Sequence, residues 1–325
     1  MADQTTTAVT PQEPPLPSGA EMAAMFEQVK NWGRWGADDE LGALRLITPE
    51  HRVAAAGLVR SGVTVSLAHD VTTEPTPQTP DPAQHTMLAC GDDLGSDGIP
   101  GYEATRDAFG TDVHGMGITH LDALCHMFVD GRMFNGASAA LVTRDGAERN
   151  SVMTAAEGIV GRGVLLDVPA ARGVDFLEPE QRITLADLHA AQDRQGLDVG
   201  VGDLLVISTG RDARTVALGG QLNPFTDGLA GLHPECLPWL RSRDVALLAS
   251  DGISDPMPFS SIERWPFPVH QVGIVGIGLM LIDNLRLDTL IEECERHRRW
   301  EFLLQVSPLR LEGATGCPVN PIATF

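Results

Sequence analysis

Three histidines and one aspartate lie within thirteen residues of this 325-residue chain, in the segment HGMGITHLDALCH at 114–126. Imidazole nitrogen and carboxylate oxygen are the atoms with which proteins hold zinc and similar divalent ions, and a catalytic site leaves one coordination position for water. If ITHLDAL is extended, His120 and Asp122 point to the same side, because side chains at i and i+2 share a face of a strand. The spacing therefore predicts that both residues contact one metal ion.

His126 is a candidate for a different role, that of proton acceptor. If a helix begins after Asp122, His126 lies one turn further along and stands beside the metal without binding it. A divalent ion lowers the pKa of a bound water, and a neutral histidine beside it completes the activation. The alternative is a polar bend with structural histidines, since a histidine is more often structural than a ligand. Spacing alone leaves both interpretations open.

Composition excludes several classes of function. The 44 acidic and 23 basic residues give a formal charge of −21, which argues against binding to nucleic acid or to an anionic membrane surface. Lys30 is the only lysine, which argues against a catalytic Schiff-base lysine, and the chain has no GxxxxGK[ST] motif of a P-loop. Five scattered cysteines without a CxxC pair indicate neither a disulfide framework nor a structural zinc site. Cys125, between apolar neighbours, is expected to be a buried thiol and not a nucleophile.

The elements that must position the histidines alternate irregularly between helix and strand. Thr48 and Pro49 begin a helix that Gly62 stops, and residues 72–101 form a long irregular segment of the kind that often serves as a lid or binding loop. Further helices are predicted at 184–196 and 287–300, strands at 63–71, 163–168, 203–209, 244–251 and 301–311, and a buried helix and strand within 268–285. Several strands follow one another directly, which predicts a single mixed α/β domain with a barrel-like sheet.

The N-terminal composition and the lengths of the apolar runs also carry predictions. Residues 1–20 are rich in Thr, Pro and Gln, which predicts a disordered tail in front of a domain at 21–325. The chain has no apolar run of membrane-spanning length, and its start lacks the basic and apolar regions of a signal peptide. We therefore expect a cytoplasmic protein.

THLDALCH resembles the central motif of the cyclase family of metal-dependent hydrolases, whose best-known member is bacterial kynurenine formamidase. That family has the pattern H-x-G-T-H-x-D-x-P-x-H. The resemblance runs from about residue 32 to the end and includes WGRWGADDELGALRLITPEHRVAAAGLVRSG, GVLLDV, GDLLVISTGR, PVHQVGIVGIGLMLIDNL and PLRLEGATGCPVNPIA. It implies that residues 21–325 form a hydrolase domain with a β-barrel-like sheet surrounded by helices. It also implies a homodimer or homotetramer.

The resemblance assigns roles to individual residues. His120 matches the second histidine ligand, and Asp122 matches the carboxylate that can bridge two metals. His126 matches the histidine that acts as general base or acid. His270 is similar to the distal histidine ligand, and Asp283 stands where the family's formamidases have a glutamate ligand. The implied cofactor is a divalent metal, Zn or Mn.

Three positions depart from the family pattern. Met116 stands where the first histidine ligand is expected, and His114 reaches the metal only if a strand bulges; otherwise it is a substrate contact. Asp283 is one carbon shorter than glutamate, and Leu124 replaces the proline. These departures favour one metal over two and keep open a reduced or metal-free site.

Two residues at predicted strand ends have two interpretations each. Arg211, after Thr209 and Gly210, is either a bidentate grip for a substrate carboxylate or a surface arginine. Asp251 either orients a ligand histidine or caps a turn.

We therefore expect a metal-dependent hydrolase that opens a C–N bond of an amide, imide or lactam in a small-molecule substrate. Metal-bound hydroxide would attack the carbonyl, and His126 would carry the proton to the leaving nitrogen. One alternative is ester or lactone hydrolysis, or the reverse ring closure, at the same site. The other is a binding protein that keeps the fold without the metal, which Met116 motivates.

Overall fold

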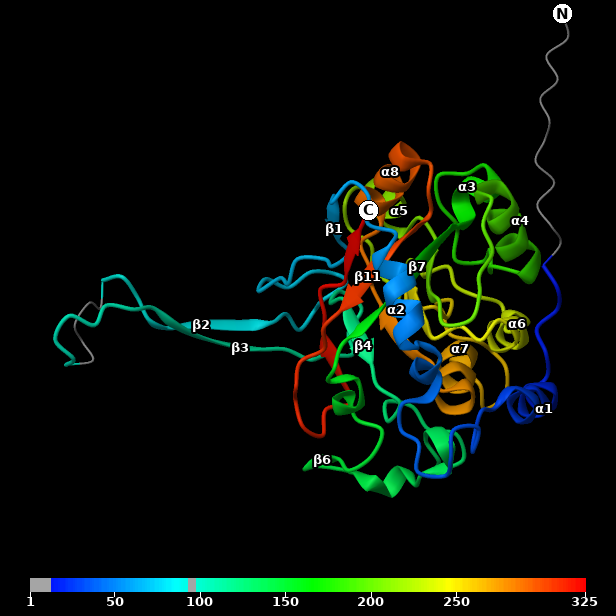
Figure 1. The fold of residues 1–325 in the computed structure, drawn as a ribbon, viewed down its shortest axis with the longest axis horizontal. Coiled ribbons are helices and arrows are strands. Elements are labelled where there is room, and N and C mark those ends of the chain that lie inside the picture. Colours follow the sequence, from blue (N-terminus) through cyan, green and yellow to red (C-terminus); the bar gives the residue numbers. More distant parts are fainter. Residues whose placement is uncertain (1–12, 93–97) are drawn as a thin grey trace, which may run out of the picture.

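A curled sheet runs through the centre of the protein, which is seen here as a computed structural model that describes residues 13–92 and 98–325 (Figure 1). Within these residues the sheet has nine strands in the order β1-β13-β11-β7-β8-β9-β10-β4-β12. The strands β7 to β10 are parallel to their sequence neighbours, and the remaining pairs are antiparallel. The sheet curls into a half-barrel with helices around it, as the sequence predicts.

The parallel strands are the most buried part of the sheet. They are β7 (Ile159–Asp167), β8 (Leu204–Ser208), β9 (Leu247–Ser250) and β10 (Met280–Asp283), and nearly all of their side chains are buried. Runs of Leu, Ile and Val suit such strands because helices or loops cover both faces of a parallel sheet. The antiparallel strands are β1 (Thr64–Ser66), β4 (His120–Asp122), β11 (Glu301–Val306), β12 (Gly316–Pro318) and β13 (Ile322–Thr324).

Helices cover the sheet, and Figure 1 shows α3, α4, α6 and α7 together on one side of it. A capping box of Thr184 and Asp187 begins α4, and Gly196 ends it with a left-handed φ of 65°. A π-helix at Gln271–Ile277 continues α7. The α-helices are α1 (Gly19–Val29), α2 (Pro49–Ala56), α3 (Val168–Arg172), α4 (Leu185–Gln195), α5 (Arg211–Ala217), α6 (Cys236–Ser242), α7 (Pro268–His270) and α8 (Asp288–His297).

Two predicted boundaries are corrected by the structure. The helix that begins at Thr48 ends at Ala56 instead of Gly62, because the amides that follow Gly57 bond to carbonyls three residues back and tighten the chain into turns. The predicted tail extends too far: residues 1–12 lie outside the described part, but Glu13 pairs with Arg182 at 2.7 Å and Ser18 caps α1. No helix in the described part of the chain is long and apolar enough to cross a membrane.

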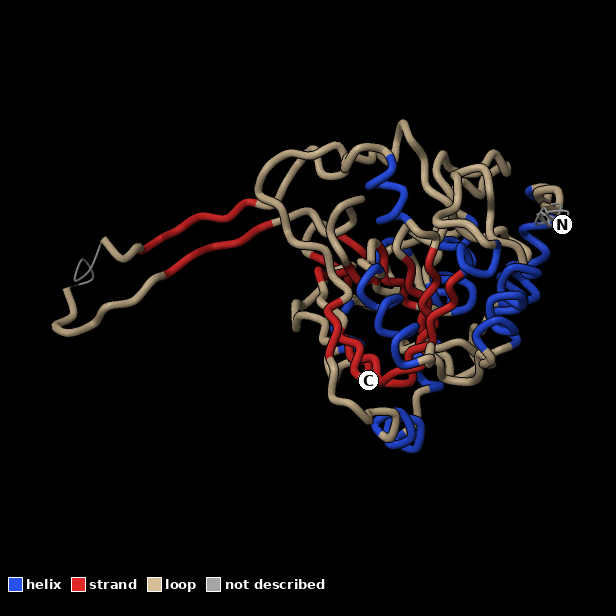
Figure 2. The backbone as a smooth tube through the Cα atoms, turned by 90° about the horizontal axis from the view of Figure 1, so that it is seen from above, coloured by secondary structure: helices blue, strands red, loops and turns tan. Residues whose placement is uncertain are grey.

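The segment predicted to be irregular, 72–101, contains a strand. In it β2 (Gln84–Ala89) pairs with β3 (Arg106–Gly110), and Figures 1 and 2 show this hairpin projecting far from the body. Residues 93–97 of the segment lie outside the described part. Sequence patterning missed β2 because both of its faces are exposed, so its residues show no alternation between apolar and polar. A second small hairpin joins β5 (Val142–Thr143) to β6 (Gly146–Ala147).

Candidate metal centre

The register of two strands gathers three of the predicted ligands. Strand β4 runs antiparallel to β10, and His120 lies directly opposite Asp283. Asp122 is two residues further along β4, so all three side chains share one face of the sheet. They are at most 4 % exposed. The extended conformation predicted for His120 and Asp122 is confirmed.

His270 reaches this face from a neighbouring helix, and Asp255 fixes its orientation. Asp255 accepts hydrogen bonds from the backbone N–H groups of Val269 and His270 and from Nδ1 of His270, the last at 2.7 Å. Nε2 of His270 therefore points inward, 3.5 Å from Oδ2 of Asp122 and 3.3 Å from Oδ2 of Asp283. Hydrogen-bonding one ring nitrogen to a carboxylate is the usual way in which proteins orient a metal-binding histidine.

His120 is oriented in a similar manner. Its Nδ1 lies 2.8 Å from the carbonyl oxygen of Ile118, which leaves Nε2 facing Asp122 at 3.4 Å. Burial opposes a positive charge on His120, but the hydrogen bond and charge of Asp122 outweigh it and raise the pKa to about 9. Burial likewise opposes charge on His270, but Asp283, Asp122 and Asp255 together raise its pKa well above the ordinary value.

His114 reaches the site although Met116 occupies the expected ligand position. Nδ1 of His114 lies 2.7 Å from Oδ1 of Asp122, and Nε2 lies 2.8 Å from the hydroxyl of Thr315. No strand bulge is needed, because β4 begins only at His120 and the segment before it is a loop. Gly316 makes room, since a Cβ there would lie 2.8 Å from Cε1 of His114. Met116 packs instead against a small apolar cluster of Leu222, Leu229, Ile253 and Met257.

His126 stands beside these residues on a turn and not on the helix that the sequence suggested. Its N–H bonds to the carbonyl of Ala123. Its ring stacks on that of His114 with centroids 3.8 Å apart, and its Nε2 is 3.9 Å from Oδ2 of Asp122. Burial lowers the pKa of His126 to about 4, only partly opposed by the charge of Asp122. The imidazole is therefore neutral near pH 7.

The side chains form two sets of donors that overlap at Asp122. One set is His114, His120 and Asp122, and the other is Asp122, His270 and Asp283; in each, the ligand atoms lie within 4.8 Å of one another. Oδ1 of Asp122 faces the first set and Oδ2 faces the second. His126 belongs to neither set.

The donor chemistry fits a divalent cation. Oδ2 of Asp122 and Oδ1 of Asp283 are buried and accept no hydrogen bond from any described residue. Burial raises the pKa of Asp283, whereas the surrounding histidines overcome burial and hold the pKa of Asp122 well below its usual range. A buried carboxylate oxygen without a hydrogen bond is unfavourable, and a cation between the two aspartates and the imidazoles would remove that cost. Asp283 also reaches His270 despite being one carbon shorter than glutamate.

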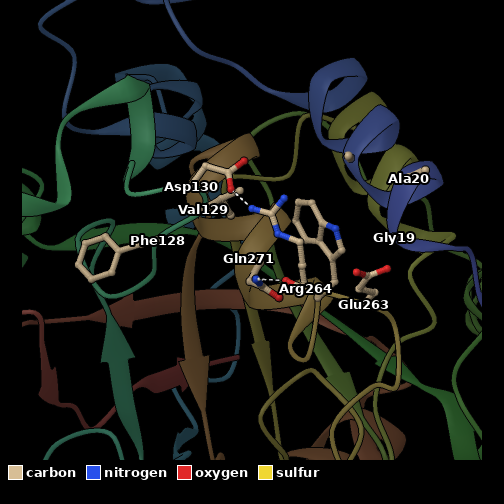
Figure 3. Close-up of a pocket in the computed structure, with 10 residues that line it drawn as sticks. Gly19, Ala20, Phe128, Val129, Asp130, Glu263, Arg264 and Gln271 are labelled. Atoms are coloured by element: carbon tan, nitrogen blue, oxygen red, sulfur yellow. Dashed lines mark hydrogen bonds and ion pairs between the residues drawn. The ribbon is translucent and has the colours of Figure 1, made fainter.

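A cavity of about 170 Å³ opens onto the donors. Its remaining wall is mainly apolar and is made by Met116, Met127, Ile253 and Phe267. A larger cavity of about 410 Å³ is lined by residues that include Phe128, Arg264 and Gln271 (Figure 3). Among the described residues its wall contains none of the candidate metal donors, so the smaller cavity is the candidate site.

Comparison with known proteins decides the family. Residues 51–255 match the family described as putative cyclase. The chain belongs to this cyclase family. A crystal structure of a novel cyclase is 30 % identical with a TM-score of 0.80, over 91 % of this chain and 100 % of that chain. The predicted fold and family are thus confirmed.

Two isatin hydrolases are more distant structural neighbours and show the same fold. Isatin hydrolase A from Ralstonia solanacearum is 22 % identical with a TM-score of 0.57, over 85 % of this chain and 97 % of that chain. An isatin hydrolase bound to the product analogue thioisatinate is 20 % identical with a TM-score of 0.55, over 82 % and 93 % of the two chains. A search of curated proteins found no match to this member of the cyclase family.

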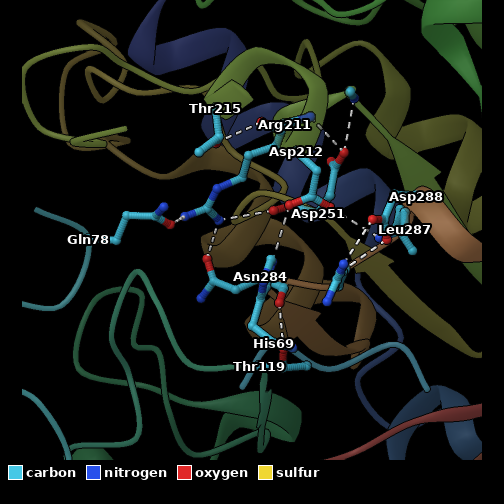
Figure 4. Close-up of polar contacts among 12 residues, drawn as sticks. His69, Gln78, Thr119, Arg211, Asp212, Thr215, Asp251, Asn284, Leu287 and Asp288 are labelled. Carbon is cyan, nitrogen blue, oxygen red and sulfur yellow. Dashed lines mark hydrogen bonds and ion pairs between the residues drawn. The ribbon is translucent and has the colours of Figure 1, made fainter. Parts of the chain in front are cut away.

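Arg211 of this cyclase-family chain does not line the cavity. It is 4 % exposed, and its terminal nitrogens donate hydrogen bonds to the carbonyl of Asp251 and to the side chains of Gln78 and Asn284 (Figure 4). A fourth hydrogen bond goes to the carbonyl of Met116. The structure therefore brings Arg211 neither to the surface nor into position for a bidentate grip on a substrate carboxylate.

Asn284 is a site-supporting residue that the sequence did not reveal. Its Nδ2 donates to the carbonyls of Gly115 and Ile118 at 2.8 and 3.0 Å, and its own carbonyl accepts from the hydroxyl of Thr119. Together with the bond from Arg211 to Met116, these contacts hold the loop between His114 and His120. The only sequence signal was that Asn284 adjoins Asp283.

The sequence left two roles open for Asp251, capping a turn and orienting a ligand histidine. In the structure Asp251 has the first role, and Asp255 has the second. The carboxylate of Asp251 accepts hydrogen bonds from the backbone N–H groups of Thr209, Gly210 and Arg211, so it caps the turn that begins α5. Asp255 orients His270. Ser254, with a φ of 61°, redirects the chain between them, and sequence patterning does not foresee that bend.

Cys125 is fully buried, as expected. Burial raises the pKa of its thiol to about 12, so the thiolate that a nucleophile requires does not form near pH 7.

Proposed function

We propose that the chain is a metal-dependent hydrolase that cleaves a C–N bond of an amide, imide or lactam. The observation that carries the proposal is the position of His126, which stands beside two overlapping sets of metal donors without belonging to either. This arrangement separates the residues that hold a cation from the residue that moves a proton. Membership of the cyclase family supports it.

His114, His120, Asp122, His270 and Asp283 would hold the ion. A mixture of imidazole nitrogens and carboxylate oxygens suits Zn²⁺ or Mn²⁺. When bound, such an ion polarises a carbonyl group and lowers the pKa of water. Asp122 faces both donor sets, so the chain offers places for one ion or two. In this proposal His114 is a metal ligand, and the alternative role of contacting the substrate is secondary.

His126 would accept the proton of the attacking water and return it to the leaving nitrogen. Its low pKa keeps the ring in the accepting form at neutral pH, and stacking on His114 fixes the plane of the ring. Met127, Ile253 and Phe267 form an apolar wall that excludes water around the substrate and suits a small, flat ring. Arg211 and Asn284 would act by holding the ligand loop.

The test is an assay of the metal-loaded protein on isatin, formyl-kynurenine, cyclic imides and lactones. Isatin belongs in the panel because two structural neighbours are isatin hydrolases. We expect turnover of a C–N substrate that disappears when the metal is removed. Turnover of lactones alone would contradict the C–N proposal, and metal-independent ligand binding without turnover would support the binding-protein alternative.

A His126→Gln variant separates proton transfer from metal binding. We expect kcat to fall about 10²- to 10⁴-fold while the bound metal stays at the wild-type level. His189→Gln is the matched control, because His189 is an exposed histidine of α4. Loss of metal together with activity in His126→Gln would show that His126 is a ligand instead.

A further inference from the structure

Met116 lies in a wall that two cavities share. The cavity of about 170 Å³ that opens onto the metal donors and a second cavity of about 180 Å³ are both lined by His114, Gly115 and Met116. Of the candidate ligands, only His114 lines the second cavity. The segment 114–116 therefore lies between the candidate metal centre and a neighbouring space whose described wall contains no other ligand.

The backbone of this shared wall is fixed. The carbonyl of Gly115 accepts a hydrogen bond of 2.8 Å from Asn284, and the carbonyl of Met116 accepts one of 2.6 Å from Arg211. Both ring nitrogens of His114 are bound, and Gly115 has no side chain. Among these three described residues, Met116 alone has a side chain that can move without breaking a hydrogen bond. A methionine side chain is flexible, so its position sets how far the two cavities communicate.

The opposite wall of the second cavity is fixed as well. Thr76 and Thr79 exchange backbone hydrogen bonds of 3.0 Å, and Gln78 between them accepts a hydrogen bond from the buried Arg211 (Figure 4). Gly117 lets this segment approach closely, because a Cβ there would collide with the hydroxyl of Thr79. The second cavity is therefore a built feature of the fold and not a gap beside a loose loop.

The second cavity differs from the first in its charge. Phe225, which is 61 % exposed, and Ile118 give it apolar surface, and Asp81 and Asp112 give it two acidic residues. No described arginine or lysine lines it. Carboxylates accept hydrogen bonds from ammonium and hydroxyl groups and repel anions. The lining therefore suits an apolar chain that ends in an ammonium or hydroxyl group.

The sizes of the two cavities favour their joint use. Pockets that hold small molecules have volumes of roughly 300 Å³ or more. Each of the two cavities is smaller than that, and only together do they reach it.

We propose that Met116 determines substrate specificity by setting the width of the passage between the two cavities, and that the substrate extends through this passage. The inference rests on the proposed hydrolase function and adds the class of substrate. That class is an amide, imide or lactam with a side chain that ends in an ammonium or hydroxyl group. The C–N bond lies at the metal donors, and the side chain passes Met116 and reaches Asp81 and Asp112. An anionic side chain is disfavoured there.

Hydroxamic acids test the passage without any turnover, because they bind divalent metal ions directly. Three probes are compared by isothermal titration into the full chain loaded with Zn²⁺: acetohydroxamate, aminohexanohydroxamate and adipic monohydroxamate. The second has a tail that ends in an ammonium group, and the third has a tail that ends in a carboxylate. The readout is the ratio of two dissociation constants in the same variant, so a change in metal affinity cancels.

Met116 is tested first. We expect aminohexanohydroxamate to bind wild type at least about 10-fold more tightly than acetohydroxamate, and Met116→Phe to reduce this gain below about 3-fold by narrowing the passage. Met153→Phe is the matched control, because Met153 is half-buried and lines neither cavity, and it should keep the wild-type gain. No gain in wild type, or an equal gain in wild type and Met116→Phe, would overturn the proposal.

Met116→Ala is a second variant that changes the passage in the other direction. A hydroxamate with a phenylene ring in its ammonium-ended tail should gain about 10-fold in affinity, relative to acetohydroxamate, when wild type is replaced by Met116→Ala. Met153→Ala is its control. An unchanged ratio in Met116→Ala would likewise reject Met116 as the residue that sets the passage. Circular dichroism confirms that each variant is folded.

The double variant Asp81→Asn with Asp112→Asn tests the predicted class of substrate. Wild type should prefer aminohexanohydroxamate to adipic monohydroxamate by about 10-fold or more, and the double variant should lose most of this preference. Asp145→Asn is the control, because Asp145 is exposed and lines neither cavity. A preference that survives the double variant would reject the second cavity as the place of the tail. Failure of acetohydroxamate itself to bind would instead reject the metal centre, and with it the proposed function.

Discussion

The hairpin of β2 and β3, called the arm from here on, and the loop that carries the metal ligands are neighbours in sequence but are held in opposite ways. The arm ends at Gly110, and the loop begins at His114. Carbonyls at three positions of the loop accept hydrogen bonds from the buried side chains of Arg211 and Asn284. The arm has its own strand pairing and exposed side chains. One short stretch of chain thus contains a preorganised site and a hairpin whose side chains are exposed.

The physical difference lies in the surroundings of the polar groups. A hydrogen bond in a low-dielectric interior is stronger, and a polar group left unpaired there is costly. An exposed ion pair such as that of His85 and Asp107 is weakened by water and salt. Equivalent substitutions in the two regions should therefore differ strongly in effect.

The largest effect is expected from Arg211→Met. The change leaves the carbonyl of Met116 and the side-chain oxygen of Asn284 buried without their donor, at about 1–3 kcal/mol each. We expect the free energy of unfolding to fall by about 3 kcal/mol or more, measured by urea denaturation. Arg264→Met is the control, because the Arg264 side chain is 71 % exposed. Its free energy of unfolding should remain close to that of wild type. Equal losses in both variants would contradict the contrast between the regions.

Asp255→Asn tests the orientation of a ligand. The carboxylate that holds Nδ1 of His270 is fully buried, and replacing it weakens the bond that aims Nε2 at the aspartates. We expect affinity for Zn²⁺ or Mn²⁺ to fall about 10- to 100-fold by competition with a chelator. Glu263→Gln is the control, because the carboxylate of Glu263 is outside the donor sets. This variant should bind the ion with wild-type affinity. An unchanged affinity in Asp255→Asn would show that His270 does not need this support.

The metal-free protein should lose stability as pH rises. The folded pKa of His120, about 9, is above its unfolded value of about 6.5, so its stabilising contribution is complete below pH 6.5 and disappears through pH 9. We expect the melting temperature to fall over this range without metal and to fall less with metal bound, because metal ligation requires neutral imidazole. His189→Gln should show the wild-type profile. A metal-free protein whose stability is constant from pH 6.5 to 9 would contradict the assigned pKa.

The smallest effect is expected in the arm. His85→Gln removes an ion pair whose two side chains are 42 and 61 % exposed. The free energy of unfolding should change by less than about 1 kcal/mol. A loss comparable to that of Arg211→Met would mean that the arm is as tightly integrated into the body as the ligand loop.

Sequence patterning predicted the parts of the fold that obey local rules. The buried strands β7 to β9 and the capped helix α4 were evident from apolar runs and from Thr184 and Gly196. The strand β2 was missed because neither of its faces is buried. Where apolar periodicity is absent, pattern analysis has no signal to use.

The site was predictable where the motif is contiguous and less so where it depends on tertiary contacts. His120 and Asp122 follow from strand geometry, and His270 and Asp283 from the family resemblance. The approach of His114 depends on a loop and on the missing side chain of Gly316. The burial of Arg211 and the role of Asp255 depend on bends that bring distant segments together. Such contacts leave no spacing in the sequence.

The central claim is that two donor sets joined at Asp122 hold a divalent ion, and isothermal titration of metal-stripped protein with Zn²⁺ and Mn²⁺ tests it most directly. Asp122→Asn removes charge from both sets at once, with Glu263→Gln as the control. We expect wild type to bind one or two equivalents and Asp122→Asn to lose affinity by about 100-fold or more. Wild-type protein that binds neither ion, or an Asp122→Asn variant that binds as tightly as wild type, would contradict it.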